Sequence, residues 1–188
     1  MREFTYDWFS SSIPNLRRWL QHFAGKPVRA LEIGCFEGMS TTWFLDNILT
    51  NPESSIHCVD TFKGSDEHSA IDFAAIKARF LRNTEGGKRV NLHVGCSTEI
   101  VSKFDLKFDF AYIDGSHRAS DVYADASVVW PKMKINGMVI FDDYLWDYYK
   151  QEDQTPKHGI DRFCSEHTDS VIVERCYQLA IVKSANKR

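Results

Sequence analysis

The sequence predicts an α/β protein built on a doubly wound, mostly parallel, seven-stranded sheet that ends in a C-terminal antiparallel hairpin. Three observations lead to this fold class. Short apolar runs typical of buried strands alternate with segments whose apolar residues recur at helical spacing. The last two strand-like runs follow each other with no helix between them. The composition, 43% hydrophobic and 26% charged over 188 residues, is that of one globular domain that can bury a core.

Four elements are expected in the first third of the chain. Residues 13–23 carry apolar side chains at helical spacing and predict a helix. Residues 28–34 are a short apolar run that ends in glycine, which is typical of a buried strand. Residues 39–49 predict a second helix with its aromatic residues turned inward, and residues 55–60 predict a second strand that ends in an acid.

The middle of the chain repeats this alternation. Residues 69–83 predict a helix that ends before two consecutive glycines, and residues 90–95 predict a third strand. Residues 108–114 predict a fourth strand, residues 119–130 a helix that ends before a proline, and residues 137–143 a fifth strand. Strands and helices in this order are typical of a mostly parallel sheet.

The C-terminal part completes the sheet. Residues 159–167 predict a short helix, and residues 170–174 and 178–183 predict the two strands of the closing hairpin. The whole chain is expected to form one domain, with residues 1–27 as an N-terminal helical lid or cap and residues 28–188 as the core.

Charge and cysteine content argue against several classes of protein. The formal net charge of -3 provides no general basic field, which argues against binding to nucleic acid or to an anionic membrane. Five cysteines without a C-x-x-C motif suggest neither a zinc ribbon nor a disulfide framework, and they indicate a reducing compartment. No segment approaches the length of a membrane span, and the first residues lack the apolar core of a signal peptide. We therefore expect a cytoplasmic protein.

Ligands of open α/β sheets bind outside the carboxyl ends of the strands, so the residues after each strand are candidates for a site. The first strand leads into EIGCFEG, in which Gly34 and Gly38 bracket the turn to the next helix. This spacing differs from the G-x-G-x-x-G of pyrophosphate-binding turns, and Glu37 would repel a diphosphate. The turn favours a cationic or zwitterionic ligand, although a turn that merely needs glycine has the same pattern.

Two further strand ends carry polar residues. Asp60 ends the second strand, where an acid can accept hydrogen bonds from both hydroxyls of a ribose. Alternatively, Asp60 is an exposed loop residue. The third strand ends in GCST, residues 95–98, whose small side chains either flank a flat base or cap the following helix. In the second case Ser97 or Thr98 is the N-cap.

Carboxylates follow the fourth and fifth strands, which are neighbours in a doubly wound sheet. Asp114 ends the fourth strand, and Asp142 and Asp143 end the fifth. Three converging carboxylates repel one another unless one holds a proton or a divalent cation lies among them. Oxygen ligands favour Mg²⁺, Ca²⁺ or Mn²⁺ over Zn²⁺. His117 follows Asp114 by three residues and suits a general base.

Each of these four residues also has a simpler interpretation. Asp114 could cap the following helix, the two later aspartates could be a solvated strand end, and His117 could be a surface histidine. Their joint placement at neighbouring strand ends favours a site over these separate interpretations.

The motifs together resemble those of class I S-adenosylmethionine-dependent methyltransferases. The resemblance rests on EIGCFEG, CVD, GCS, YIDGSH and GMVIFDDY in this order, and it covers the chain from about residue 28 to the end. It is closest to small-molecule O-methyltransferases of the macrolide-sugar type. It implies a Rossmann-like methyltransferase fold, S-adenosylmethionine as cofactor, and a divalent cation, Mg²⁺ in that group. The implied reaction is O-methylation of a hydroxyl on a small-molecule acceptor, a sugar or a secondary metabolite.

Carried over position by position, the resemblance implies a role for individual residues. His117 is the implied catalytic base, which deprotonates the acceptor hydroxyl. The implied metal ligands are Asp114, Asp142 and Asp143. The implied cofactor-binding residues are Glu32, Gly34, Cys35, Gly38, Asp60, Thr61, Cys96, Ser97 and Asp114. Among these, Glu32, Gly34 and Gly38 would line the methionine part, Asp60 would hold the ribose hydroxyls, and Cys96 and Ser97 would lie by the adenine.

Other functions stay open from the sequence. One is a metal-independent methyltransferase of the same fold, in which the aspartates are only structural. Another is a catalytically inactive cofactor-binding module that acts as a partner subunit. A Rossmann dehydrogenase is disfavoured by the glycine spacing. Trp146, Tyr148 and Tyr149 would form an acceptor wall or pack on a second subunit, which is consistent with a homodimer.

Overall fold

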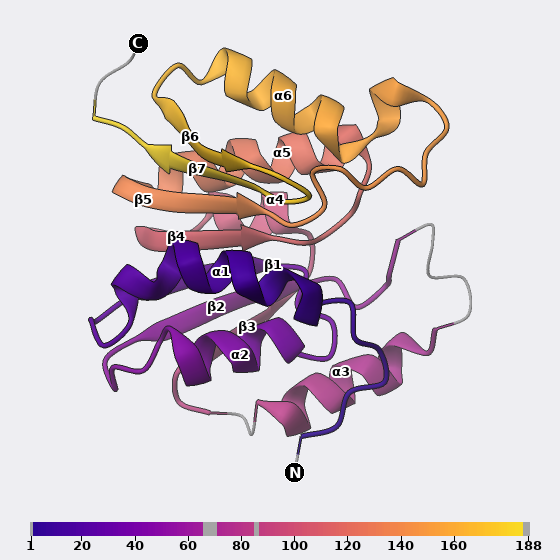
Figure 1. Ribbon diagram of the computed structural model, residues 1–188. Coiled ribbons are helices and arrows are strands. Elements are labelled where there is room, and N and C mark those ends of the chain that lie inside the picture. Colours follow the sequence, from indigo (N-terminus) through magenta and orange to yellow (C-terminus); the bar gives the residue numbers. More distant parts are fainter. Residues whose placement is uncertain (1, 66–70, 85–86, 186–188) are drawn as a thin grey trace.

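The computed structural model describes residues 2–65, 71–84 and 87–185 (Figure 1). Within these residues one seven-stranded sheet has the strand order β3-β2-β1-β4-β5-β7-β6. The five strands from β3 to β5 run parallel, and β7 is antiparallel to both β5 and β6. This topology confirms the predicted doubly wound sheet and its C-terminal hairpin.

The regular elements alternate as predicted. The strands are β1 Arg29–Ile33, β2 Ser55–Asp60, β3 Val90–Val94, β4 Phe108–Ile113, β5 Met133–Phe141, β6 Ser170–Arg175 and β7 Leu179–Lys183. The α-helices are α1 Ile13–Leu20, α2 Met39–Asn47, α3 Phe73–Asn83, α4 Ser97–Ser102, α5 Ala119–Val129 and α6 Pro156–Glu166. Short 3₁₀ turns lie at Ser10–Ser12, Gln21–Phe23, Trp130–Lys132 and Glu152–Gln154.

Helices cover both faces of the sheet in two layers (Figure 1). On one face, Leu16 of α1, Phe44 of α2 and Phe80 of α3 belong to one core cluster. On the other face, Val101 of α4 and Phe163 of α6 belong to a second cluster, together with apolar residues of α5. Successive residues of a strand point to opposite faces, so each central strand contributes to both clusters. None of the helices in the described residues is long and apolar enough to span a membrane.

Several element boundaries differ from the prediction by a few residues, and α3 and β5 show the physical reason. Helix α3 begins at Phe73 because the Asp72 side chain caps it, accepting hydrogen bonds from the backbone N–H groups of Ala74 and Ala75. Of the predicted start of this helix, residues 69–70 lie outside the described residues. Strand β5 begins at Met133, before the predicted start, because Met133 already pairs with Phe108 of β4. An exposed bulge at 134–136 separates this pair from the rest of the ladder.

The helix of the predicted N-terminal cap lies in the layer that covers the sheet. Leu16 and Leu20 of α1 are fully buried against the same cluster as α2 and α3. The segment before α1 runs past α3, where the backbone of Glu3 exchanges two hydrogen bonds of 2.8 Å with the Asn83 side chain. The backbone N–H of Thr5 donates to Glu37 in the turn after β1, so this segment reaches the carboxyl ends of the strands, where the candidate site lies.

Candidate active site

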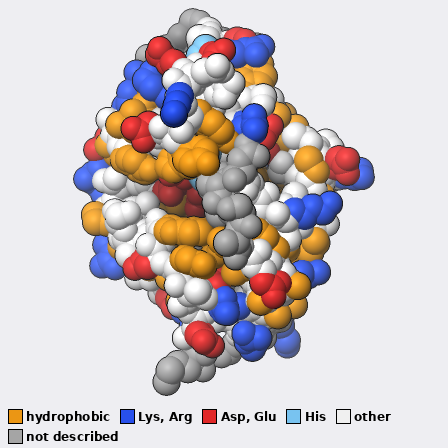
Figure 2. All heavy atoms as spheres, turned by 90° about the vertical axis from the view of Figure 1, so that its right-hand side faces the viewer, with side chains coloured by type: hydrophobic (Ala, Val, Ile, Leu, Met, Phe, Trp, Pro, Cys, Tyr) orange, Lys and Arg blue, Asp and Glu red, His pale blue; other side chains and the backbone are white. Residues whose placement is uncertain are grey.

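A cavity of about 540 Å³ opens at the carboxyl ends of the parallel strands. Residues that follow β1, β2, β3 and β4 line it, together with aromatic residues of the N-terminal segment. Figure 2 shows this face of the molecule, where hydrophobic side chains border a hollow that contains acidic side chains. The place agrees with the general rule for ligand sites in open α/β sheets.

Most of the residues implied to bind the cofactor lie in the wall of this cavity. The residues in the wall are Gly34, Cys35, Asp60, Thr61, Cys96, Ser97 and Asp114. Glu32 and Gly38 are not in the wall. The structure therefore brings together strand ends that are far apart in the sequence, and it places two of the expected residues behind the surface.

The turn after β1 needs its glycines for steric reasons. Gly34 has a φ of +77°, and a Cβ atom there would lie only 1.9 Å from the carbonyl oxygen of Asp114. Gly38 has a φ of +81° and caps α2, and a Cβ atom there would lie 3.0 Å from the ring of Phe80. The first glycine thus allows the β1 turn to touch the β4 loop, and the second allows α3 to pack on α2.

Asp60 connects the turns after β1 and β2. Its Oδ2 atom accepts hydrogen bonds from the backbone N–H groups of Cys35 at 2.9 Å and Phe36 at 3.0 Å. Its Oδ1 atom accepts one from the N–H of Phe62 at 2.7 Å. A carboxylate has about four acceptor positions, so Asp60 retains acceptor capacity toward the cavity. The interpretation as an exposed loop residue does not agree with these contacts.

Glu32 lies beneath the turn rather than against a ligand. It is fully buried and accepts hydrogen bonds from the hydroxyl groups of Ser40 and Thr41 and from the thiol of Cys58. Burial raises the pKa of Glu32 to about 7. Ser40 lines the cavity, so Glu32 influences the wall through this neighbour.

The charge of Glu37 is compensated, which corrects the electrostatic argument drawn from the sequence. Glu37 is almost fully buried and forms an ion pair with Arg79 of α3. Its other oxygen accepts a hydrogen bond of 2.6 Å from the backbone N–H of Thr5. Arg79 lies 42 residues along the chain, so its pairing could not be inferred from the local sequence. Glu37 therefore does not present the free negative charge that was expected to repel a diphosphate.

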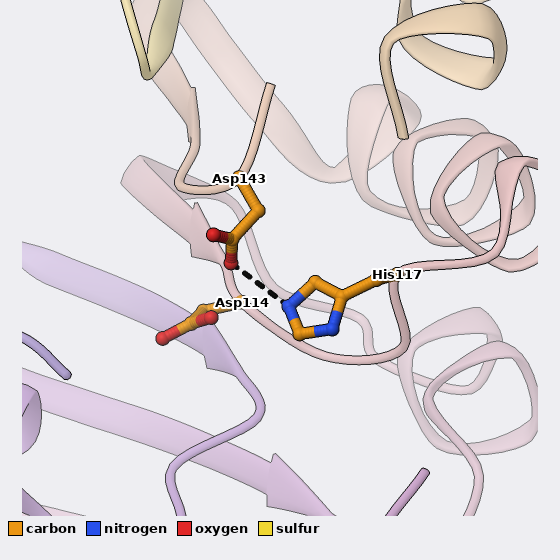
Figure 3. Close-up of side chains that lie close together, drawn as sticks. All are labelled: Asp114, His117 and Asp143. Atoms are coloured by element: carbon orange, nitrogen blue, oxygen red, sulfur yellow. Dashed lines mark hydrogen bonds and ion pairs between the residues drawn. The ribbon is translucent and has the colours of Figure 1, made fainter. Parts of the chain in front are cut away.

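Asp114, His117 and Asp143 form a compact cluster at the edge of the cavity (Figure 3). One ligand atom from each of them lies within 4.8 Å of the others. The Nε2 atom of His117 lies 2.8 Å from Oδ2 of Asp143, and the Tyr177 hydroxyl donates to Oδ1 of Asp143 at 3.1 Å. Two carboxylates and an imidazole in this arrangement could hold a divalent cation. Asp114 does not cap α5, whose N-cap is Arg118.

Asp142 points away from this cluster. Its Oδ1 atom accepts hydrogen bonds from the Ser12 hydroxyl at 3.0 Å and from the side-chain amide of Gln178. It is 5% exposed, which contradicts the interpretation as a solvated strand end. Asp142 and Asp143 lie in the turn that follows β5, and in this turn their side chains reach different partners. A role for Asp142 as a third metal ligand stays a prediction that this arrangement does not support.

Burial and like charges destabilise the ionised acids of this region. The pKa of Asp114 is raised well above its ordinary range, first by burial and then by the nearby Asp142 and Asp143 carboxylates. Burial, with the Asp143 charge, also raises the pKa of Asp142. A bound cation would reverse such shifts, because it stabilises the ionised form. The raised pKa values of Asp114 and Asp142 agree with the need for one of the two remedies expected from the sequence, which are a bound proton and a metal ion.

Trp146 packs against His117. The rings of His117 and Trp146 stack with centroids 4.4 Å apart, and Tyr148 stacks with Trp146 at 5.2 Å. Tyr149 lies under the guanidinium group of Arg118, 5.5 Å from its ring centroid. These contacts hold the histidine between a carboxylate and an indole, which fixes the position of its ring.

Sequence reasoning missed one feature of the wall. Asp125 of α5 is nearly buried and accepts a hydrogen bond from the Ser97 hydroxyl, so Ser97 does not cap α4; the N-cap is Cys96. The signal was available, because Asp125 lies three residues after Val122, on the buried side of the helix. In the N-terminal segment, which was expected to form a lid, Tyr6 and Trp8 line the cavity, and their rings stack at 4.8 Å.

Comparisons with known proteins agree with this geometry. A family model described as a methyltransferase domain matches residues 31–144. No curated protein matches the chain in sequence. Among solved structures, the MycE methyltransferase of the mycinamycin biosynthetic pathway, in complex with Mg, SAH and mycinamycin VI, superposes with a TM-score of 0.69 at 16% identity. That alignment covers 95% of this chain and 51% of MycE, so the chain spans about half the length of MycE.

Two shorter structures align over most of both chains. The O-methyltransferase NovP has a TM-score of 0.68 at 15% identity, with 92% of this chain and 79% of NovP covered. An O-methyltransferase from Bacillus cereus in complex with SAH has a TM-score of 0.66 at 16% identity, with 96% and 84% covered. These structures share the fold, and the family model covers more than half of the sequence. The chain belongs to the methyltransferase-domain family.

Proposed function

We propose that the chain is a metal-assisted O-methyltransferase that methylates a hydroxyl group of a small molecule, a sugar or a secondary metabolite. The observation that carries this proposal is the cluster of Asp114, His117 and Asp143 beside the cavity. It combines ligands for a divalent cation with a side chain that can accept a proton. Burying acidic side chains costs free energy, so these residues are not explained by the stability of the fold alone.

The cavity suits S-adenosylmethionine, which supplies the methyl group when bound. The turn after β1 presents the backbone of Gly34 and Cys35, and Asp60 offers acceptor positions that fit ribose hydroxyls. Asp60 also fixes the turn through two backbone amides, so the donor site is formed before any ligand enters. A preformed site favours transfer because the reacting groups lose less freedom when they align.

The donor set of the cluster fits a divalent cation such as Mg²⁺ or Mn²⁺. Asp114 and Asp143 would hold the ion, and His117 lies beside them as the proposed base. When bound, the ion lowers the pKa of an acceptor hydroxyl. The raised pKa of Asp114 means that this acid resists ionising alone, so cation binding and its deprotonation are coupled.

His117 is suited to accept the proton of the acceptor hydroxyl. An ionised Asp143 can only accept at 2.8 Å, so the neutral imidazole carries its hydrogen on Nε2 and its lone pair on Nδ1. The ring becomes an imidazolium when it takes up the proton of the acceptor hydroxyl. Asp143 and Trp146 orient the ring, and the Asp143 carboxylate stabilises the imidazolium that forms.

A small-molecule acceptor is supported by the neighbours and by the cavity wall. The MycE structure contains mycinamycin VI, a small-molecule ligand. In this chain Tyr6, Trp8 and Phe36 form an aromatic group at the cavity, with Trp8 and Phe36 centroids 5.0 Å apart. Such a wall suits an acceptor with an apolar ring face.

The proposal is tested by methyl transfer from radiolabelled S-adenosylmethionine to a panel of hydroxyl acceptors that includes free sugars, macrolide glycosides and catechols. We expect transfer in Mg²⁺, loss of transfer in EDTA, and recovery on addition of Mg²⁺ or Mn²⁺. Transfer that is unchanged in EDTA would favour a metal-independent enzyme of the same fold. Tight binding of S-adenosylhomocysteine without transfer to any acceptor would favour an inactive binding module.

A further inference from the structure

Asp125 is a buried acid that the reaction described above does not use. It lies on the inner side of α5, is 5% exposed, and nevertheless lines the cavity. Its Oδ1 atom accepts a hydrogen bond from the hydroxyl of Ser97, the first residue of α4. A carboxylate in so buried a position is costly unless hydrogen-bond donors meet it. Its position therefore calls for a donor in addition to Ser97.

The other carboxylate oxygen of Asp125 faces the β4 loop. A Cβ atom added at Gly115 would lie 3.4 Å from Oδ2, so the glycine leaves space beside this oxygen. Among the described residues, Ser97 is the one that hydrogen-bonds to the Asp125 side chain. The remaining acceptor capacity of the carboxylate is thus offered to whatever occupies the cavity.

The strand order indicates which part of the cofactor meets Asp125. Strands β1, β2 and β3 are consecutive in the sheet, and the turn of Gly34, Asp60 and Ser97 follow them in that order. A nucleoside with its ribose at Asp60 and its amino acid part at the β1 turn extends its base toward Ser97. Asp125 lies next to Ser97, at the base end of this path. This step rests on the proposed cofactor site.

We propose that Asp125 recognises adenine by accepting a hydrogen bond from its exocyclic amino group, and that it thereby selects an adenosyl cofactor. Adenine presents an N–H donor at the position where hypoxanthine and guanine present a carbonyl oxygen. A base with an oxygen there would place two acceptors against each other and leave the buried carboxylate unpaired. Asp125 is thus a specificity-determining residue of the donor site.

The ionisation of Asp125 is compatible with this role. Burial raises the pKa of Asp125 to about 7, and the Asp121 carboxylate adds to the effect, whereas the Ser97 hydrogen bond opposes it. Both the acid and the carboxylate retain an oxygen that can accept from an amino group, but the acid can also donate to a carbonyl oxygen. Discrimination against hypoxanthine is therefore fullest above pH 7, where the carboxylate predominates, and binding is compared there.

Calorimetric titration with S-adenosylhomocysteine and S-inosylhomocysteine tests the proposal. We expect the wild type to bind the adenosyl compound more tightly by on the order of 10- to 100-fold. In Asp125→Asn the amide oxygen can accept from Ser97 while the amide NH₂ faces the base, so the preference falls at least about tenfold or reverses. Should this variant not fold, Asp125→Ser is measured in the same way, and loss of preference is expected.

Asp105→Asn is the matched control, because it makes the same substitution at an exposed position outside the cavity wall. We expect its preference for the adenosyl compound to equal that of the wild type. A wild-type preference below about threefold, or a preference that Asp125→Asn leaves unchanged, would overturn the proposal. Absence of binding to either compound would instead contradict the cofactor site itself.

Discussion

The Nε2 atom of His117 lies 2.8 Å from Oδ2 of Asp143, across two loops that are 26 residues apart in the sequence. The contact forms because β4 and β5 are parallel neighbours, so the loops that leave them begin side by side. The same carboxylate accepts from the Tyr177 hydroxyl, which precedes β7. Three loops of the sheet therefore meet at Asp143, and this junction fixes the orientation of the proposed base.

Replacing His117 with alanine tests whether it accepts the proton. We expect kcat to fall by at least about 10²-fold, because a positioned general base contributes that much, while the Kd for S-adenosylhomocysteine stays unchanged. His158→Ala, at an exposed position of α6, is the control and should keep wild-type turnover. Steady-state kinetics give kcat, and calorimetry gives Kd. Wild-type turnover in His117→Ala would remove this residue from the mechanism.

Trp146 is expected to act by positioning His117. Because the indole stacks on the imidazole, Trp146→Ala should free the ring and lower kcat by about tenfold, whereas Trp146→Phe keeps an aromatic face and most of the activity. The pH profile of kcat should also shift in Trp146→Ala, since the environment of the imidazole changes. An unchanged profile with a raised KM would instead assign Trp146 to the acceptor wall.

Gly34 is predicted to tolerate no side chain. In Gly34→Ala the new Cβ would collide with the Asp114 carbonyl oxygen at a positive φ, so we expect a loss of more than about 3 kcal/mol in the free energy of unfolding. Gly25→Ala is the matched control, because Gly25 has a φ of +78° but nothing within 4 Å of its Cβ position. It should cost only about 1 kcal/mol. Urea denaturation measures the free energy of unfolding of both variants. Equal losses in Gly34→Ala and Gly25→Ala would show that the contact of Gly34 with the Asp114 backbone does not limit this position.

Glu32 should make the protein less stable as the pH rises. Its pKa is raised from 4.5 to about 7 in the folded state, so the unfolded chain releases this proton at a lower pH than the folded chain does. The contribution to stability is therefore full below pH 4.5 and is lost as the pH rises through about 7. Glu32→Gln removes this titration and should reduce the fall in unfolding free energy over that range by about 1–3 kcal/mol.

Urea denaturation at several pH values measures this effect. Glu53→Gln, at an exposed position, is the control and should keep the wild-type pH dependence. If Glu32→Gln loses stability with rising pH as steeply as the wild type does, then Glu32 does not carry the buried proton.

The sequence predicted the features that depend on local pattern. Hydrophobic periodicity located the seven strands, and the rule that ligands bind at strand ends pointed to Asp60, Asp114 and Asp143. The position of Gly34 followed from the turn, although its reason is the backbone of Asp114 rather than a ligand. These predictions hold because they depend on neighbours in sequence and on strand order.

The remaining features depend on contacts between distant segments. The pairing of Glu37 with Arg79 and the contact of Ser97 with Asp125 join different helices and loops, so no local pattern announces them. The divergence of Asp142 from Asp143 likewise depends on distant partners, because both lie in the turn after β5 and bond to Ser12 and His117, respectively.

The central claim is that Asp114 and Asp143 hold a cation beside the base His117, and that Asp142 is excluded from this site. Mn²⁺ titration followed by electron paramagnetic resonance, with S-adenosylhomocysteine present, tests it most directly on the wild type, Asp143→Asn and Asp142→Asn. We expect one site in the wild type, at least about tenfold weaker binding in Asp143→Asn, and binding within about threefold of the wild type in Asp142→Asn. Equal weakening by both substitutions would restore the three-carboxylate site, and no bound Mn²⁺ in the wild type would contradict the account.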